Sequence, residues 1–170
     1  MFRSLVTPPA VASLALSAWL FTAALPTGHA MAEEQTGDAI QEEGSADGAA
    51  SPMEAAEKAD KGSLTNPYSG DADAAKQGHE LYMAAGCNGC HGGTGGGGMG
   101  PPLSNPVWIY GDDDDTLFRL IALGSDPLLE HGYTRTGSEK AVGPMPAQGT
   151  IVKSTDDMWK IITWIHSINS

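Results

Sequence analysis

The pentapeptide Cys87-Asn88-Gly89-Cys90-His91 constrains this chain more than any other feature, because it contains both of its cysteines. Two thiols at this spacing can each add to a vinyl group of one haem, and the adjoining histidine is then held under the iron as an axial ligand. The 170 residues include 22 glycines and only 6% aromatic residues, so they offer little bulk for a core. We therefore expect one covalent haem (haem c), attached through Cys87 and Cys90 with His91 as an iron ligand, to form part of the core.

The cysteine pair has three other interpretations. A thioredoxin-like dithiol needs a βαβ context, which the sequence around the pair does not indicate. A zinc site needs two further ligands, and besides His91 the imidazoles after residue 32 are His79, His131 and His166. A simple disulfide is the structural alternative, and an oxidising compartment would permit one.

The first 32 residues differ in character from the rest. Arg3 is followed by an apolar run at residues 11–25, and Ala30-Met31-Ala32 has the small residues that a signal peptidase recognises. These features predict a secretory signal peptide at residues 1–32, cleaved near Ala32. An uncleaved anchor is the alternative, but the run is shorter than the ~20 residues of a membrane-spanning helix. We expect a periplasmic protein that is not inserted in the membrane after cleavage.

Residues 33–66 are rich in Ala, Gly, Ser, Glu and Asp, with nine acidic and two basic side chains. Such a segment cannot bury enough apolar surface to offset its chain entropy. We therefore predict an acidic disordered linker at residues 33–66, with at most a transient helix near residues 53–61. A single folded domain would then occupy residues 67–170.

The net charge of −12 limits the kind of partner. Phosphate binding needs clustered Lys and Arg side chains, which argues against nucleic acid. Residues 67–170 alone carry a net charge of −6, which implies a basic surface on the partner. The run Asp112–Asp115 lacks the spacing of an EF-hand calcium loop, so we interpret it as the solvated N-terminus of a helix.

Three helical patterns occur in the predicted domain, and no sustained alternation of period two occurs, which predicts an all-α fold. The first pattern lies between Asp71 and Gly86, and the second spans residues 115–123 and ends at Gly124. The third begins at Ser154 and carries the clearest apolar stripe. This stripe consists of Met158, Ile161, Ile162, Ile165 and Ile168.

The second axial ligand of the iron decides whether the protein transfers electrons or binds small molecules, because a methionine opposite the histidine closes the iron to small molecules. Met145 follows His91 by 54 residues and can return across the opposite face of the haem, where flanking prolines would stiffen its loop. Met99 is only eight residues from His91 and belongs naturally on the histidine side. We predict Met145 as the ligand, with Met99, His131 or an open site as alternatives.

Several motifs follow one another in a familiar order. They are Gly78 and Tyr82 before the cysteine pentapeptide, then Gly100-Pro101-Pro102-Leu103, then Met145, then a terminal helix with Trp164. In this order, residues 71–170 resemble a class I c-type cytochrome, a fold of helices and loops wrapped around one covalently bound haem. The resemblance implies a helix crossing at Gly78 and Trp164. It also implies that the Pro101 carbonyl accepts a hydrogen bond from His91.

Within that class, three further segments are similar to the cytochrome cL group. They are Asn66-Pro67-Tyr68, Trp108-Ile109-Tyr110-Gly111 and Gly143-Pro144-Met145. This resemblance implies a periplasmic electron acceptor of a pyrroloquinoline-quinone (PQQ) methanol or alcohol dehydrogenase, which passes electrons to a downstream cytochrome or oxidase. Trp108 and Tyr110 would line the haem or simply pack in the core.

An electron carrier of this kind supplies axial ligands and a dry pocket but no substrate chemistry, so we expect no enzymatic activity. The alternative within the same class is a generic periplasmic cytochrome c that serves another donor. A gas-binding or peroxide-reducing haem protein would instead need an open iron, which Met145 would close.

Overall fold

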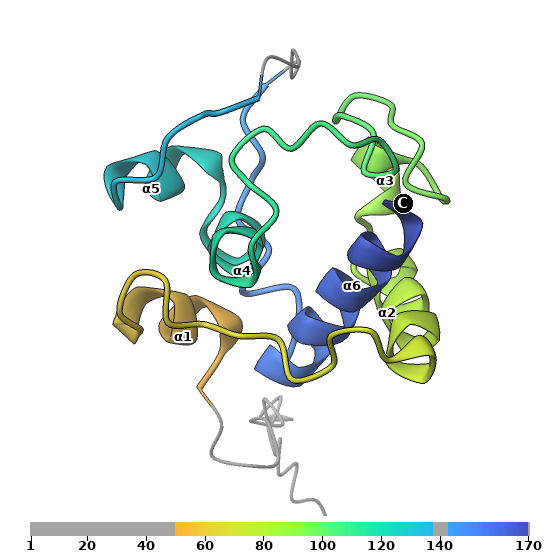
Figure 1. Ribbon diagram of the computed structural model, residues 1–170, viewed down its shortest axis with the longest axis horizontal. Helices are drawn as coiled ribbons and strands as arrows, with labels where there is room; N and C mark the ends of the chain where they lie inside the picture. Colours follow the sequence, from red (N-terminus) through yellow and green to blue (C-terminus); the bar gives the residue numbers. More distant parts are fainter. Residues whose placement is uncertain (1–49, 138–142, 170) are drawn as a thin grey trace, which may run out of the picture. The chain divides into compact units, whose positions relative to one another are not determined.

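The computed structural model describes residues 50–137 and 143–169. The predicted signal peptide and residues 33–49 of the predicted linker lie outside this part. Six helices and no strand occur within it, which confirms the predicted all-α architecture (Figure 1). The helices are α1 (Pro52–Lys58), α2 (Ala72–Ala84), α3 (Asn88–His91), α4 (Asp114–Leu123), α5 (Ser125–Glu130) and α6 (Thr155–Ile168). None of the helices among these residues is both long enough and apolar enough to cross a membrane.

The closest helix pair is α2 and α6, which cross where α2 has no side chain. A Cβ atom built on Gly78 would lie 1.9 Å from the carbonyl oxygen of Lys160. The predicted crossing at Gly78 is therefore present, but its nearest neighbours are backbone atoms of α6. Trp164 lies one turn further along α6 and packs on Tyr82 and His79, with ring centroids 4.3 and 4.7 Å away.

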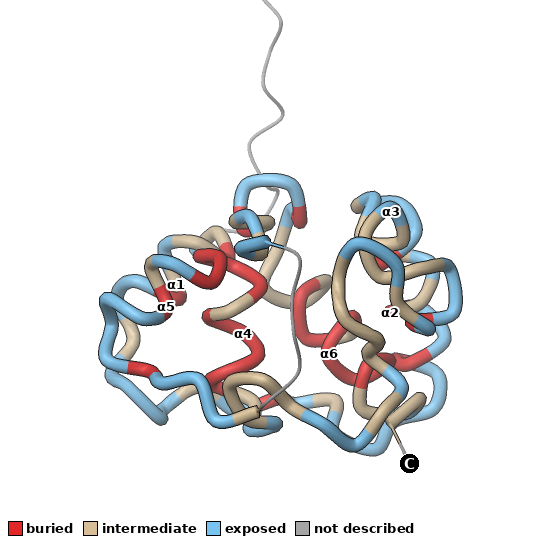
Figure 2. Tube along the Cα trace, turned by 90° about the horizontal axis from the view of Figure 1, so that it is seen from above, coloured by how far each residue is buried: buried red, intermediate tan, exposed pale blue. Residues whose placement is uncertain are grey.

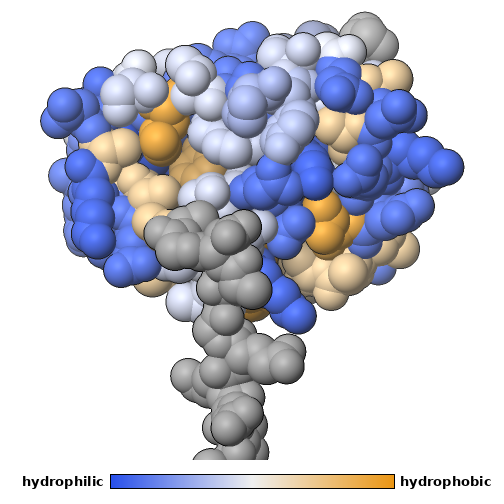
Figure 3. Space-filling view, turned by 90° about the horizontal axis from the view of Figure 1, so that it is seen from below, coloured by the Kyte–Doolittle hydropathy of each residue, from blue (hydrophilic) through white to orange (hydrophobic). Residues whose placement is uncertain are grey.

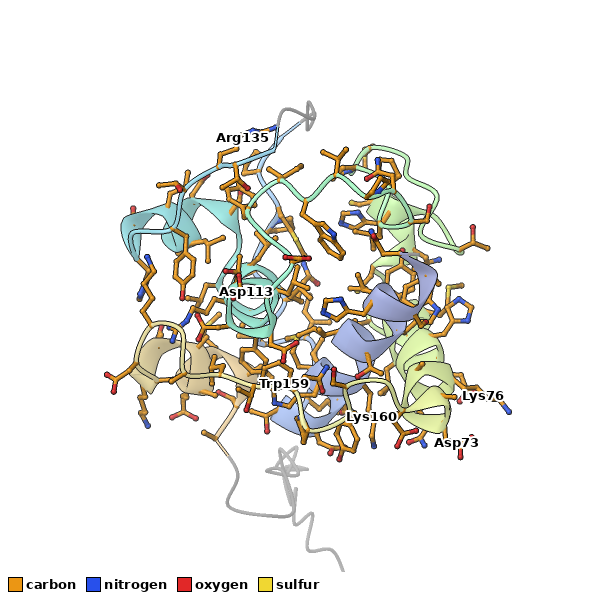
Figure 4. All side chains as sticks on the ribbon, viewed as in Figure 1. Asp73, Lys76, Asp113, Arg135, Trp159 and Lys160 are labelled. Atoms are coloured by element: carbon orange, nitrogen blue, oxygen red, sulfur yellow. The ribbon has the colours of Figure 1, made fainter. Side chains whose placement is uncertain are left out.

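The core lies between α4 and α6, where most of the buried positions are found (Figure 2). Ser154 caps α6 by accepting a hydrogen bond from the amide of Asp157 at 3.1 Å, as predicted. Trp159 of α6 packs on Phe118 of α4 with ring centroids 4.4 Å apart, and so joins the two helices (Figure 4). The predicted stripe of α6 is buried except for Ile168, which is partly exposed.

The predicted disorder of residues 33–66 is wrong for residues 50–66, which belong to the folded unit. Ser51 and Glu54 form a reciprocal capping box at the start of α1, and Pro52 and Ala56 are buried. At the other end, the guanidinium of Arg119 donates hydrogen bonds to the carbonyls of Ala56, Ala59 and Asp60. Composition could not reveal this segment as ordered, because its stability comes from a partner far along the chain.

The aspartate run at the start of α4 is only partly solvated, which corrects the prediction. Asp113 caps the helix by accepting from the amide of Thr116 at 2.9 Å, but Asp115 is 3% exposed. Its carboxylate pairs with Arg119 at 3.0 Å and accepts a hydrogen bond from the Tyr133 hydroxyl. Within residues 50–137 and 143–169, no group of three or more His, Cys, Asp or Glu side chains is placed to hold a metal ion.

Electrostatics in this buried cluster follow from its hydrogen bonds. Burial raises the pKa of the Asp115 carboxyl, but the hydrogen bonds from Arg119 and Tyr133 outweigh this effect and hold it below its usual range. Burial and the neighbouring carboxylate raise the pKa of Tyr133 to about 12. Near neutral pH the Asp115 carboxyl is therefore ionised and the Tyr133 phenol keeps its proton, so the phenol can donate a hydrogen bond to the carboxylate.

Candidate functional site

The two cysteines and the adjoining histidine share one short helical turn. The turn begins where Gly86 ends the previous helix with a φ of 77° and stops at Gly92 with a φ of 78°. Inside it, the amide of His91 donates to the carbonyl of Cys87 at 3.0 Å. The two thiols are not joined to each other, and burial raises the pKa of the Cys87 thiol. The turn thus places both sulfurs and the imidazole within one short segment.

His91 is held by a hydrogen bond that fixes its protonation pattern. Its Nδ1 atom lies 2.9 Å from the carbonyl oxygen of Pro101, as the class I resemblance implied. A carbonyl oxygen can only accept, so Nδ1 carries the proton and the lone pair of Nε2 is available to a metal. Gly100 lies against the ring, because a Cβ atom there would be 2.8 Å from Cε1. Any larger residue at position 100 would displace the imidazole.

The glycine-rich loop after the histidine closes around the same turn. The amide of Gly97 donates to the His91 carbonyl at 2.8 Å, and the amide of Gly100 donates to the Cys90 carbonyl at 2.9 Å. The Tyr82 hydroxyl reaches across from α2 and donates to the Gly92 carbonyl at 2.6 Å. These bonds satisfy the last carbonyls of the turn and tie the loop to α2.

Met145 lies on a segment that runs beside the end of α4. Its amide donates to the Ser125 hydroxyl at 3.0 Å, and its carbonyl accepts from the Ser125 amide at 3.0 Å. Further along, the amides of Gln148 and Gly149 donate to the carbonyls of Ile121 and Ala122. Met145 is partly buried against the core, whereas Met99 is 67% exposed.

One cavity of about 560 Å³ brings the predicted site residues together. Cys87, Cys90, His91 and Met145 all line it, and Met99 lines it as well, whereas His131 does not. Its volume lies in the ~300–1,000 Å³ range of cofactor and ligand sites. Most of the remaining wall is apolar and comes from α4, α6 and the loop between α3 and α4. This wall includes Leu103, Trp108, Ile109, Leu117, Leu120, Ile121, Ile161 and Ile165.

Several lining residues were not predicted from the sequence. Ser125, Asp126, Arg135 and Asn169 all line the cavity, and Asp126 and Arg135 are the charged side chains among the described residues of its wall. Figure 4 shows Arg135 on the segment that follows α5. A lone serine, aspartate, arginine or asparagine carries no spacing signal, so the sequence offered no means of finding these four residues.

The cytochrome c family model matches residues 75–169, which is more than half of the chain. The protein therefore belongs to the cytochrome c family, and its fold is the class I cytochrome c fold. As a member of this family it is an electron carrier with covalently bound haem c. The cavity fits that group, because it presents two thiols, an imidazole with a free Nε2 lone pair and a large apolar wall.

Two solved structures are similar to the chain. Cytochrome cL from the marine methylotroph Methylophaga aminisulfidivorans MPT is 29% identical, with a TM-score of 0.45, over 62% of this chain and 59% of that one. Cytochrome cL from Hyphomicrobium denitrificans is 30% identical, with a TM-score of 0.45, over 61% of this chain and 52% of that one. The chain thus spans less than two thirds of either structure. No curated protein matches it significantly.

Proposed function

We propose that this cytochrome is a periplasmic carrier that accepts electrons from a PQQ-dependent methanol or alcohol dehydrogenase and passes them to a downstream cytochrome or oxidase. The support is the sequence resemblance to the cytochrome cL group. Two of the three segments that carry it, 108–111 and 143–145, line the cavity. The residues that resemble the group thus lie where they would contact the haem.

The observation that carries the site assignment is the shared cavity. In our proposal, Cys87 and Cys90 would hold the haem covalently, and His91 and Met145 would bind its iron. When bound, the haem supplies the one-electron chemistry. The Pro101 carbonyl keeps the His91 proton on Nδ1, so Nε2 would be free to bind the iron. The Met145 sulfur would take the remaining ligand position and so keep small molecules from the iron.

The ligand assignment is tested with Met145→Ala and, as a matched control, Met99→Ala. Loss of a thioether ligand lowers the reduction potential and opens the iron, so Met145→Ala should have a lower potential and bind carbon monoxide readily. Met99→Ala should keep the potential of the wild type. The opposite pattern would identify Met99 as the ligand. If both variants kept the wild-type potential, both methionines would be excluded as ligands.

The donor is tested by mixing oxidised cytochrome with a reduced PQQ-dependent alcohol dehydrogenase and following haem reduction. The control is an unrelated cytochrome c of similar potential and charge. We expect much faster reduction of this protein than of the control. Equal rates would favour the second candidate function, a generic periplasmic cytochrome c that serves another donor.

Export is tested separately from the donor. We propose cleavage near Ala32, so the haem-stained protein should appear in the periplasmic fraction with an N-terminus near Glu33. Recovery with Met1 intact, or in the membrane fraction, would contradict export by a cleaved signal peptide.

A further inference from the structure

Met145 carries the one backbone N–H group of residues 144–146. Both neighbours, Pro144 and Pro146, are prolines and lack a backbone N–H, so the tripeptide has one donor. This amide donates to the Ser125 hydroxyl at 3.0 Å. The side chain of Ser125 therefore takes the only backbone hydrogen bond that residues 144–146 can donate.

The carbonyl of Met145 is held from the same residue. It accepts from the amide of Ser125 at 3.0 Å, so both polar backbone groups of Met145 pair with Ser125. The approach is close because Gly124 precedes Ser125: a Cβ atom at position 124 would lie 2.7 Å from the Met145 carbonyl oxygen. Ser125 itself is 4% exposed, so water has little access to replace its hydroxyl.

We propose that Ser125 is a positioning residue for Met145, and this proposal rests on Met145 being the second axial ligand. The two hydrogen bonds fix the backbone of Met145 against the junction of α4 and α5. With the backbone fixed, the side chain has few ways to leave the cavity that it lines. Ser125 thus governs how long the methionine stays in place, and it acts through the backbone of Met145.

The test compares Ser125→Ala with Ser154→Ala. Each replacement removes one hydroxyl that accepts a backbone hydrogen bond. The Ser125 hydroxyl accepts from the Met145 amide at 3.0 Å, and the Ser154 hydroxyl accepts from the Asp157 amide at 3.1 Å. Ser154 caps α6, so its variant controls for a loss of stability without a change at Met145. The measurements are the rate at which imidazole binds to the ferric holoprotein and the intensity of its sulfur-to-iron charge-transfer absorption.

We expect imidazole to bind roughly two- to tenfold faster to Ser125→Ala than to the wild type, the range that one lost hydrogen bond represents. The charge-transfer absorption should weaken in the same variant. Ser154→Ala should match the wild type in both measurements, and Ser125→Thr should keep the slow rate because it retains the hydroxyl. Equal behaviour of Ser125→Ala and Ser154→Ala would overturn the proposal.

Two further measurements keep the result unambiguous. If Ser125→Ala does not fold, hydrogen exchange of the Met145 amide in the reduced wild type takes its place, and exchange at the rate of a free peptide would overturn the proposal. Met145→Ala separates the two levels of inference. A wild-type imidazole rate in Met145→Ala would refute the axial ligand, whereas a fast rate there with a slow Ser125→Ala would refute only the role of Ser125.

Discussion

At the scale of single residues, the absence of a side chain at Gly78 sets the distance between α2 and α6. The nearest neighbours of this position are backbone atoms of Lys160 and Ile161, which cannot rotate away as a flexible side chain can. The glycine is therefore required by packing, and not by the turn geometry that explains Gly86 and Gly92. Sequence reasoning found the position but could not show what faces it.

We expect Gly78→Ala to destabilise the holoprotein by about 1–3 kcal/mol, because the new methyl group would overlap the Lys160 carbonyl and force the helices apart. This is the net change, after the gain of ~1 kcal/mol that alanine usually brings to a helix. The measurement is denaturant unfolding followed by circular dichroism. Gly96→Ala is the control, since its Cβ would meet its nearest neighbour at 3.7 Å; equal midpoints for the two variants would contradict the prediction.

The Asp115 carboxylate should make the stability of the fold depend on pH. Its folded-state pKa is lowered, whereas an aspartate in the unfolded chain titrates near ~3.9. Its contribution is therefore complete above about pH 5 and is lost as the pH falls through the lower folded-state pKa. The stability lost in Asp115→Asn should be constant near neutral pH and should shrink below about pH 4.

Free energies of unfolding between about pH 7 and 2 test this behaviour, with the exposed Asp112→Asn as the matched control. A difference between Asp115→Asn and the wild type that does not change with pH would contradict it. So would a difference that grows in acid.

At the scale of secondary-structure elements, length decided what the sequence could predict. The long helices α2, α4 and α6 have apolar periodicity and side-chain caps at their N-termini, and glycines follow α2 and α4. The bounds of all three fall within about two residues of those expected. Helices α1 and α5 have seven and six residues, too few for a periodic signal to emerge. Likewise the spacing around Cys87 and the prolines around Met145 predicted residues that line one cavity. The hydrogen bond between Met145 and Ser125 joins residues 20 positions apart, so no local pattern could predict it.

Helix α1 should depend on Arg119. In the wild type we expect slow hydrogen exchange at the amides of Ala55 and Ala59, which donate to carbonyls at 2.9 and 3.1 Å. In Arg119→Met these amides should exchange as in an unstructured chain, while those of α2 stay protected. The reason is that the guanidinium donates hydrogen bonds to three carbonyls at the end of α1. The site is buried, so water could not take over these hydrogen bonds if the guanidinium were removed.

Lys58→Met is the control, because Lys58 forms only an exposed ion pair with Glu54. Protection at α1 should be nearly the same in this variant as in the wild type. Rapid exchange of α1 already in the wild type would restore the original prediction of disorder.

At the scale of the whole molecule, 21 acidic side chains outnumber nine basic ones. The chain carries a net charge of −12, and the face in Figure 3 is mostly hydrophilic with separate apolar spots. Such a surface attracts a basic partner over a distance of about a Debye length, ~10 Å at 0.1 M salt. Steering of this kind raises the rate of encounter more than the final affinity.

Electron transfer from the protein donor should therefore slow as salt is added. We expect the second-order rate constant to fall severalfold between about 20 and 300 mM ionic strength, because the Debye length shortens. Reduction by a neutral small-molecule reductant is the control and should change little. A protein-donor rate that is flat across this range would show that net charge does not guide docking.

The contact between Arg119 and α1 also decides where this domain can be cut. A shortened chain with only the family-matched residues 75–169 would keep the Asp115–Arg119 pair but lose the carbonyls of Ala56, Ala59 and Asp60. The guanidinium, 2% exposed in the intact fold, would lose these acceptors, and each unsatisfied donor would cost ~1–3 kcal/mol if it stayed buried. The smallest independently stable fragment should therefore start near Ser51, some distance before the boundary that sequence similarity suggests.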